Sequence, residues 1–209
     1  MSDILTLTQW LSPAFPVGAF AFSHGVETAV TSGLINSAES LEAWLIDLLE
    51  LGSLRSDAVL LSLAYSADDL PAVQETAVAF QASSERLEEA QQIGASFCRT
   101  VRDVWGFDLP DLSYPVAVGR AAALKGLPLE ETAALYAHSF LANIVSAAIR
   151  LVPLGQTEGQ AVLARLQEKC AALGKEAANF RQDDLSNAAF LSDVQAMRHE
   201  IETPRIFQS

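Results

Sequence analysis

Apolar residues recur at helical spacing along most of this chain, in segments that end at glycine or proline. The 209 residues include 34 Ala and 29 Leu, and this excess over β-branched and aromatic residues favours helices over sheet. We find no alternating apolar pattern long enough to indicate a strand. The length favours one domain spanning residues 1–209, and we predict an all-α, single-domain bundle of about eight to ten helices.

The same periodicity predicts where the individual helices lie. The clearest one follows Asn36, which we expect to cap it, with Glu39 completing a capping box. Further helices are expected at about 53–65, 71–82, 84–104, 115–125, 128–153 and 157–173, the last ending at Gly174. The 128–153 helix has an apolar stripe made of Leu135, His138, Ala142, Val145 and Ile149. Its small residues permit close packing and predict a homodimer, with His138 as a hydrogen-bonded core residue.

The chain is strongly acidic, with 26 Asp and Glu against 13 Lys and Arg and a formal net charge of -13. A nucleic-acid backbone would be repelled by this charge, so we expect no nucleic-acid partner. Residues 35–90 contain 11 acidic side chains and only two basic ones, Arg55 and Arg86. This stretch is interpreted either as solvated helix faces or as a surface complementary to a basic partner.

Several cellular classes are disfavoured by the sequence. The first basic residue is Arg55, so the start of the chain lacks the cationic segment of a secretory leader, and we expect a cytoplasmic protein. The longest apolar stretch, 140–154, is interrupted by polar residues and is too short to span a bilayer, so no membrane association is expected. Cys98 and Cys170 are far apart and are expected to be buried free thiols.

Segment 12–27 is the most unusual in composition, because two prolines and two glycines bracket three aromatic residues. Gly18 can adopt a backbone conformation that a β-carbon would oppose, and Ser23 is a plausible cap for a short helix that ends before Gly33. Rigid aromatic loops offer contact area at small entropic cost. The segment is therefore predicted to bind a partner, through Pro16, Gly18, Phe20, Phe22, His24 and Glu27.

An enzymatic interpretation of the same segment is also open. His24 and Glu27 lie one helical turn apart and could form an acid/base pair in a cofactorless helical hydrolase. Adjacent helical residues diverge by about 100 degrees, so Ser23 and His24 are poorly placed as nucleophile and base. No GxSxG motif surrounds Ser23.

Segment 150–160 joins two predicted helices. Its glycines lack the Lys-Ser/Thr pair of a phosphate-binding loop, so nucleotide binding is disfavoured. We expect a structural corner, with Arg150 hydrogen-bonding the carbonyls at the helix end, and a partner contact is the alternative. The residues of this predicted structural loop are Arg150, Pro153, Gly155, Gln156, Gly159 and Gln160.

The C-terminal tail, residues 193–209, is predicted to dock on a partner. It looks unable to bury itself, and from about Met197 onward we expect it to be mobile until a partner orders it. The proposed contacts are Arg198, His199, Glu200, Arg205, Ile206 and Phe207. His199 and Glu200 begin like a zinc-protease motif, but Thr203 occupies the second histidine position. We therefore expect no permanent metal site and name His24 and His199 as candidates for transient metal contact.

Three groups of residues, taken in order, resemble the UreF family of urease accessory proteins. They are Ser12-Pro13, Pro16-Val17-Gly18, Ser23-His24-Gly25 and Glu27; Arg150-Leu151, Pro153-Leu154-Gly155-Gln156 and Gly159-Gln160; and Met197-Arg198-His199-Glu200, Arg205 and Phe207. The resemblance covers nearly the whole chain. Each group alone is weakly specific, and the combination is specific.

This resemblance implies an all-helical, cytoplasmic, non-catalytic protein that dimerises. It implies binding of the accessory protein UreD, called UreH in some systems, through the C-terminal part, and recruitment of the GTPase UreG. The complex would deliver nickel to apo-urease, with the UreF-type protein coupling or gating GTP hydrolysis. It would have no cofactor of its own, because the complex handles the nickel. A helical adaptor for a different target stays open as an alternative.

Overall fold

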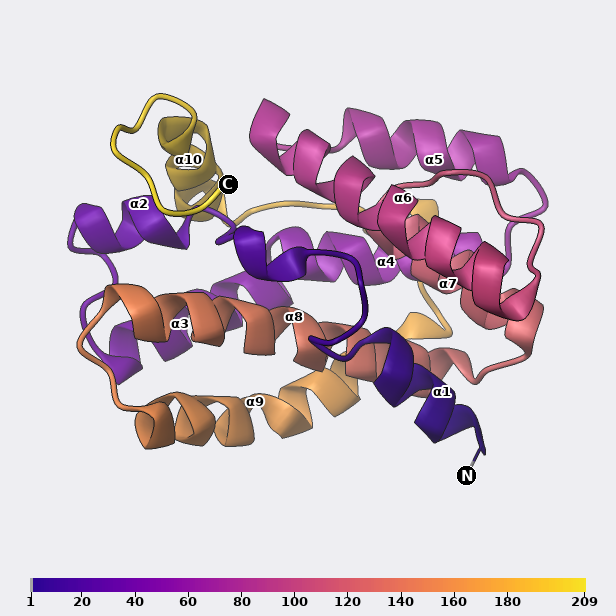
Figure 1. The fold of residues 1–209 in the computed structure, drawn as a ribbon, viewed down its shortest axis with the longest axis horizontal. Helices are drawn as coiled ribbons and strands as arrows, with labels where there is room; N and C mark the ends of the chain where they lie inside the picture. Colours follow the sequence, from indigo (N-terminus) through magenta and orange to yellow (C-terminus); the bar gives the residue numbers. More distant parts are fainter. Residues whose placement is uncertain (1) are drawn as a thin grey trace.

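The computed structural model describes residues 2–209, which form ten α-helices, two short 3-10 turns and no strand (Figure 1). The elements are α1 (Ser2–Trp10), η1 (Ala19–Ala21), α2 (Val26–Thr31), α3 (Ala38–Glu50), α4 (Ser53–Tyr65), α5 (Leu70–Ala79), α6 (Ser84–Trp105), α7 (Tyr114–Lys125), α8 (Leu129–Leu151), α9 (Gln156–Ala177), η2 (Gln182–Asp184) and α10 (Phe190–His199). The predicted all-α fold and helix number are confirmed.

The helices pack around α8, which crosses the middle of the molecule in Figure 1 with α9 alongside it. Helix α4 packs against α7, and α7 against α6, while α10 lies against α2. Glycines permit two of the closest helix pairs. A β-carbon at Gly119 of α7 would lie 2.1 Å from the Leu61 carbonyl oxygen of α4, and one at Gly159 of α9 would lie 2.5 Å from Ile149 Cδ1 of α8.

Helices α4 and α6 begin and end within a residue of the predicted bounds, but the cap of α3 differs from the prediction. Ser37, in an extended conformation, caps α3 and accepts a hydrogen bond from the Ser40 N–H at 3.3 Å. Ser40 Oγ in turn accepts from the Ser37 N–H at 3.0 Å, so Ser37 and Ser40, not Asn36 and Glu39, form the capping box. The Asn36 side chain instead donates to the Gly33 carbonyl, which closes the preceding turn.

Gly174 does not end α9, which continues to Ala177. A β-carbon at Gly174 would lie 2.5 Å from the Glu130 carbonyl oxygen, so this glycine permits close contact with α8 rather than marking a helix end. Helices α1 and α10 lie outside the predicted helix ranges, and α10 ends within the tail that we expect to be mobile from about Met197.

Helix α8 buries a wider face than the predicted stripe. Its buried positions include Tyr136, Phe140 and Ile144, and of the stripe only Val145 is buried. His138 is half-buried and makes no hydrogen bond within residues 2–209, so its prediction as a hydrogen-bonded core residue is wrong. The helix is long and apolar enough to cross a membrane by length and composition, a test that a buried core helix also passes.

Candidate functional site

The C-terminal tail folds back onto segment 12–27 of its own chain. The carbonyl oxygen of Ser209 accepts hydrogen bonds from the N–H and the hydroxyl of Ser23, at 2.7 and 2.5 Å, and the Gln208 N–H donates to the Ala21 carbonyl at 2.9 Å. Phe207 and Ser209 are only 3% and 2% exposed. The expectation that the tail cannot bury itself is wrong for these residues, because residues far away in the sequence provide the neighbours that the local sequence lacks.

Glu27, on α2, is the main anchor of the tail. Its carboxylate accepts the backbone N–H groups of Ile206 at 2.7 Å and Phe207 at 2.9 Å, and it contacts His199 Nε2 at 3.2 Å. Glu27 is 6% exposed, so its charge is compensated mainly by these donors. The Ser23 hydroxyl accepts the Glu27 N–H at 3.3 Å, which ties the start of α2 to the same contact region.

His199 lies between two carboxylates and is fully buried. Its Nε2 faces Glu27 and its Nδ1 lies 2.7 Å from Glu85 Oε2, in the first turn of α6. A neutral imidazole has a single N–H and donates to one of the two carboxylates, whereas a protonated ring donates to both. Glu85 also pairs with Arg205, which adds a second link between the tail and α6.

Glu200 caps the start of α6 from the tail. Its Oε1 accepts the Ser84 N–H at 2.8 Å and the Ser84 hydroxyl at 2.6 Å. These hydrogen bonds lower the pKa of the Glu200 carboxyl from its ordinary value. The positive end of the helix dipole favours a carboxylate at this position, so α6 and the tail stabilise one another.

A second buried cluster joins His24, Arg86 and Glu89. His24 has a positive φ of 56°, and its Nε2 lies 3.0 Å from Glu89 Oε1 while its Nδ1 meets the Arg86 guanidinium. Burial, followed by repulsion from Arg86, holds the pKa of His24 well below its ordinary value. The neutral ring therefore donates Nε2–H to Glu89 and accepts from Arg86 at Nδ1. Glu89 also accepts from Arg86 and, at 2.7 Å, from the Ser209 hydroxyl.

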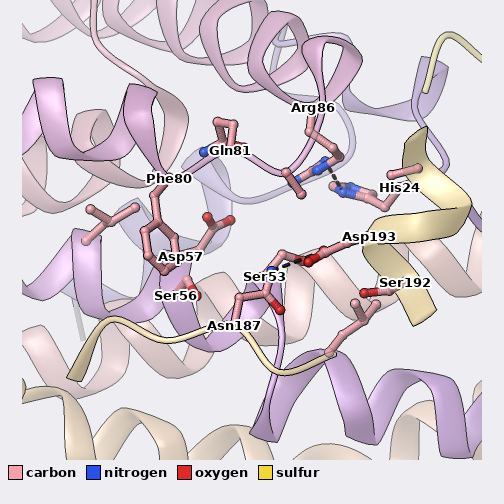
Figure 2. Close-up of a pocket in the computed structure, with 14 residues that line it drawn as sticks. His24, Ser53, Ser56, Asp57, Phe80, Gln81, Arg86, Asn187, Ser192 and Asp193 are labelled. Carbon is pink, nitrogen blue, oxygen red and sulfur yellow. Dashed lines mark hydrogen bonds between the residues drawn. The ribbon is translucent and has the colours of Figure 1, made fainter. Parts of the chain in front are cut away.

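Asp57 of α4 lies beside this cluster (Figure 2). It is 7% exposed and accepts a hydrogen bond from the Tyr136 hydroxyl at 2.8 Å. Burial raises the pKa of the Asp57 carboxyl to about 6, against the opposing influence of Arg86. Burial and the Asp57 charge also raise the pKa of Tyr136 well above its ordinary value.

The acid/base pair considered for His24 and Glu27 is not formed. His24 contacts Arg86 and Glu89, whereas Glu27 contacts His199 and the tail backbone, so the two side chains belong to separate clusters. Within residues 2–209 no group of three or more His, Cys, Asp and Glu side chains is arranged to hold a metal ion. Cys98 and Cys170 are buried free thiols, as predicted, and burial raises the pKa of each to about 11.

Residues 12–22, which we call the aromatic loop, present the Phe20 ring to solvent and bury the rings of Phe15 and Phe22. Gly18 adopts the left-handed conformation expected of it, with φ of 77°. Asn143 of α8 holds the loop by donating to the Ala19 carbonyl at 3.0 Å. Phe20 is 70% exposed whereas Phe22 is buried, so Phe20 is the ring of the proposed partner contact that a partner can reach. Pro16, in the same loop, is also exposed.

Arg150 contacts the aromatic loop and the C-terminal tail. The prediction that it hydrogen-bonds the carbonyls at the end of its own helix is therefore wrong. Its Nη2 donates to the Phe20 carbonyl at 3.2 Å, and its guanidinium lies 4.5 Å from the centre of the Phe207 ring. The rest of segment 150–160 is a structural corner, where the Gly155 N–H donates to Glu158 at 2.7 Å. Pro153, Gln156 and Gln160 are exposed, and Gly159 is buried against α8.

An exposed apolar surface, which we call the tail face, covers α10 and the residues that follow it. Its members share high exposure and are Phe190 (73%), Leu191 (52%), Val194 (39%), Met197 (50%), Ile201 (85%) and Ile206 (73%). The spacing from 190 to 201 is that of one helix side, so hydrophobic periodicity could have identified it. Arg198 and Arg205 are exposed nearby.

These features define a class: an all-helical protein whose C-terminal tail is held by carboxylates of α2 and α6 and presents an apolar surface. The sequence model of the UreF family matches residues 35–167. Urease accessory protein UreF of Roseobacter denitrificans is 48% identical over 207 residues, covering 98% of this chain and 93% of that protein. The corresponding protein of Ruegeria pomeroyi is 47% identical over 210 residues, covering 99% and 97%.

A more distant relative, urease accessory protein UreF of Azorhizobium caulinodans, is 44% identical over 221 residues, covering 98% of this chain and 95% of that protein. The chain belongs to the UreF family of urease accessory proteins. This is a family of accessory proteins rather than of catalytic enzymes.

Proposed function

We propose that this protein is a cytoplasmic, non-catalytic component of the machinery that matures urease. It binds a UreD/UreH-type accessory protein through its C-terminal tail and recruits the GTPase UreG. The assembly inserts nickel into apo-urease, and this chain couples or gates GTP hydrolysis. Membership of the UreF family, over nearly the full length of its relatives, supports the proposal.

The tail face is the single observation that carries the partner assignment. Six large apolar side chains are exposed on one short helix and the residues after it, and contiguous apolar surface on a soluble protein marks interaction sites. The surface is also held firmly in place, because Glu27 and Glu85 fix the chain on either side of Ile206. A preformed surface binds with a smaller entropic penalty than a mobile one.

Phe20 is a further exposed aromatic ring, on the loop that contacts the tail. Arg150 contacts both the Phe20 carbonyl and the Phe207 ring, so loop and tail are joined at this point. We therefore place the contacts with the UreD/UreH-type partner on Phe20, Met197, Ile201 and Ile206, with Arg198 and Arg205 at the polar edge.

Nickel, in this proposal, is cargo of the complex and not a resident ion of this chain. Both ring nitrogens of His199 face carboxylates, and both ring nitrogens of His24 face Arg86 or Glu89. Either histidine would have to leave these partners before its ring could accept a metal ion. Their candidacy for transient contact therefore requires local opening of the tail.

A homodimer is part of the same proposal. Ser139 and Ala142 of α8 are half-buried, and small residues allow two helices to approach closely. Size-exclusion chromatography with light scattering would show a dimer mass, and a strictly monomeric chain at tens of micromolar would contradict this part.

Co-purification tests the partner assignment directly. The chain would be expressed with the UreD- and UreG-type proteins of its own genome, and Met197→Asp or Ile201→Asp should weaken capture of the UreD-type protein at least ~10-fold. Truncation after Thr203 should keep the helical circular-dichroism spectrum and abolish capture. Leu124→Asp, on an exposed position of α7, is the matched control and should capture normally. Undiminished capture by the tail-face variants would sink the assignment.

A further inference from the structure

A cavity of about 280 Å³ lies between the aromatic loop and helices α6, α7 and α8. Its walls are mostly apolar and include Val17, Ile93, Phe140 and Ala142. The proposed contacts with the UreD/UreH-type partner do not use it, apart from Phe20 at its edge. Apolar cavities of this size with a few convergent polar groups are typical of small-ligand sites.

Asp57 is a carboxylate at this cavity that, unlike Glu89, forms no salt bridge within the described residues. It also lines the smaller cavity of Figure 2, so the carboxylate borders both spaces. Its one hydrogen bond within residues 2–209 comes from the Tyr136 hydroxyl, to Oδ2, and it forms no ion pair. Oδ1 accepts no hydrogen bond within residues 2–209, and it is not one of the fully enclosed side-chain atoms, so it is accessible although the side chain as a whole is only 7% exposed.

The charges around Asp57 leave its own charge without a partner. Arg86 is paired with Glu89, and His24 is neutral, so the four groups together carry one excess negative charge. Burial raises the pKa of the Asp57 carboxyl to about 6, although the Arg86 charge acts in the opposite direction. Tyr114, whose ring packs on Tyr136, also lines the cavity, and its hydroxyl makes no hydrogen bond within residues 2–209.

We propose that this cavity binds an ammonium group carried on an apolar stem, with the ammonium at Asp57 and the stem against the walls formed by Ile93, Phe140 and Ala142. A cation at this position neutralises the excess charge and donates to the free oxygen of Asp57. The stem excludes water from the walls, which strengthens the ion pair. A free organic amine and the lysine side chain of a protein share this chemistry.

Binding at this site is coupled to the tail through shared residues. Arg86 and Glu89 border the cavity, and Glu89 also accepts the Ser209 hydroxyl at 2.7 Å. A cation that attracts the Glu89 carboxylate therefore acts on a residue that holds the tail. The proposal concerns the isolated chain and does not depend on the identity of the urease partners.

Isothermal titration of the purified chain at pH 7.5 tests the proposal, with benzylammonium as the probe and benzyl alcohol as its uncharged analogue. We expect saturable binding of benzylammonium, at least ~10-fold tighter than that of the alcohol. Nα-acetyl-lysine amide is the second probe: tighter binding of this probe assigns a protein lysine, and tighter binding of benzylammonium assigns a free amine. Equal affinity for amine and alcohol, or no saturation of either amine by about 10 mM, overturns the proposal.

Two cavity variants, Asp57→Asn and Ala142→Leu, and one control, Asp111→Asn, test whether the binding occurs in the cavity. Asp57→Asn should weaken benzylammonium binding at least ~10-fold and leave benzyl alcohol binding unchanged. Asp111→Asn, at an exposed carboxylate paired with Arg102, makes the same charge change elsewhere and should bind like the parent chain. Ala142→Leu fills part of the cavity and should weaken both ligands. Retained amine binding in folded Asp57→Asn contradicts the proposal.

The pH dependence of binding to the unaltered chain tests the role of Asp57 without any variant, and so does not depend on whether a variant folds. Because the ammonium prefers ionised Asp57, its affinity should rise about 10-fold between pH 5 and pH 7. The charged and titratable groups that line the two cavities together with Asp57 are His24, Arg86, Glu89, Tyr114, Tyr136, His138 and Asp193. A pH-independent affinity for benzylammonium, which stays charged over this range, would refute the role of Asp57.

Discussion

Replacing Glu27 by alanine should release the C-terminal tail without unfolding the helical bundle. The variant leaves three donors without their acceptor, namely the N–H groups of Ile206 and Phe207 and the His199 ring. Each buried donor left unsatisfied costs about 1–3 kcal/mol, so the docked tail loses on the order of 3–9 kcal/mol. Burial of Phe207 contributes only about 2–3 kcal/mol. The tail therefore lowers its free energy by undocking and returning these groups to water.

Limited trypsin digestion measures this release. The bond after Arg205 is protected when Ile206 and Phe207 are held by Glu27, and in Glu27→Ala its cleavage should accelerate at least ~10-fold. The denaturant midpoint of the bundle should change little, because the packing around α8 is untouched. Glu27→Gln retains one acceptor oxygen and should give an intermediate rate. Glu168→Ala, at an exposed site on α9, is the matched control.

An unchanged cleavage rate in Glu27→Ala would show that the reasoning is wrong. In that case the contacts of Glu85, Glu89 and Glu200 alone would suffice to hold the tail. Hydrogen exchange of the Phe207 amide provides a second readout and should show the same loss of protection.

Three further predictions concern the core and the loop. The pKa of the Asp57 carboxyl is raised from 3.8 to about 6, so the folded chain binds the Asp57 proton more tightly than the unfolded chain does. The free energy of unfolding should therefore fall by about 3 kcal/mol as the pH rises from about 4 to about 6. Denaturant titrations across this range should show the decline, and Asp57→Asn should remove it. Gly119→Ala places a methyl group against the Leu61 carbonyl and should cost about 2–3 kcal/mol, with a lower Tm by calorimetry; an unchanged Tm would mean that α4 and α7 separate freely. Phe20→Ala should change stability by less than about 0.5 kcal/mol, because the ring is 70% exposed, yet weaken capture of the UreD-type partner at least ~10-fold; normal capture would remove Phe20 from the interface.

Local patterns in the sequence predicted most of the helices, because helical periodicity depends on residues three and four positions apart. The bounds of α4 and α6 follow from that spacing and from the residues at their ends. The cap of α3 was misplaced by one residue, since Asn36 and Ser37 are both good caps and only the backbone conformation distinguishes them. A sequence pattern does not decide which of two adjacent cap-forming residues is the cap.

The tail site could be predicted only in part. The sequence identified Glu27, His199 and Arg205 as important, but not that Glu27 holds Ile206 and Phe207, which lie 179 and 180 residues further along the chain. No periodicity relates residues at such separations. The burial of Phe22 and the exposure of Phe20 were equally hidden, because both are aromatic and only the tertiary fold decides which ring meets solvent.

The distance in sequence between the tail and its anchors has a consequence for the order of folding. Helices α8 and α9 are joined by a short turn and form early, because closing a short loop costs little entropy. Contacts such as Ser23 with Ser209 close a loop of 186 residues and are expected to form last. The tail face is therefore complete only on a chain that has finished folding. A partner that binds this surface, as we propose, would select mature chains and leave folding intermediates free, so docking would act as a checkpoint on assembly.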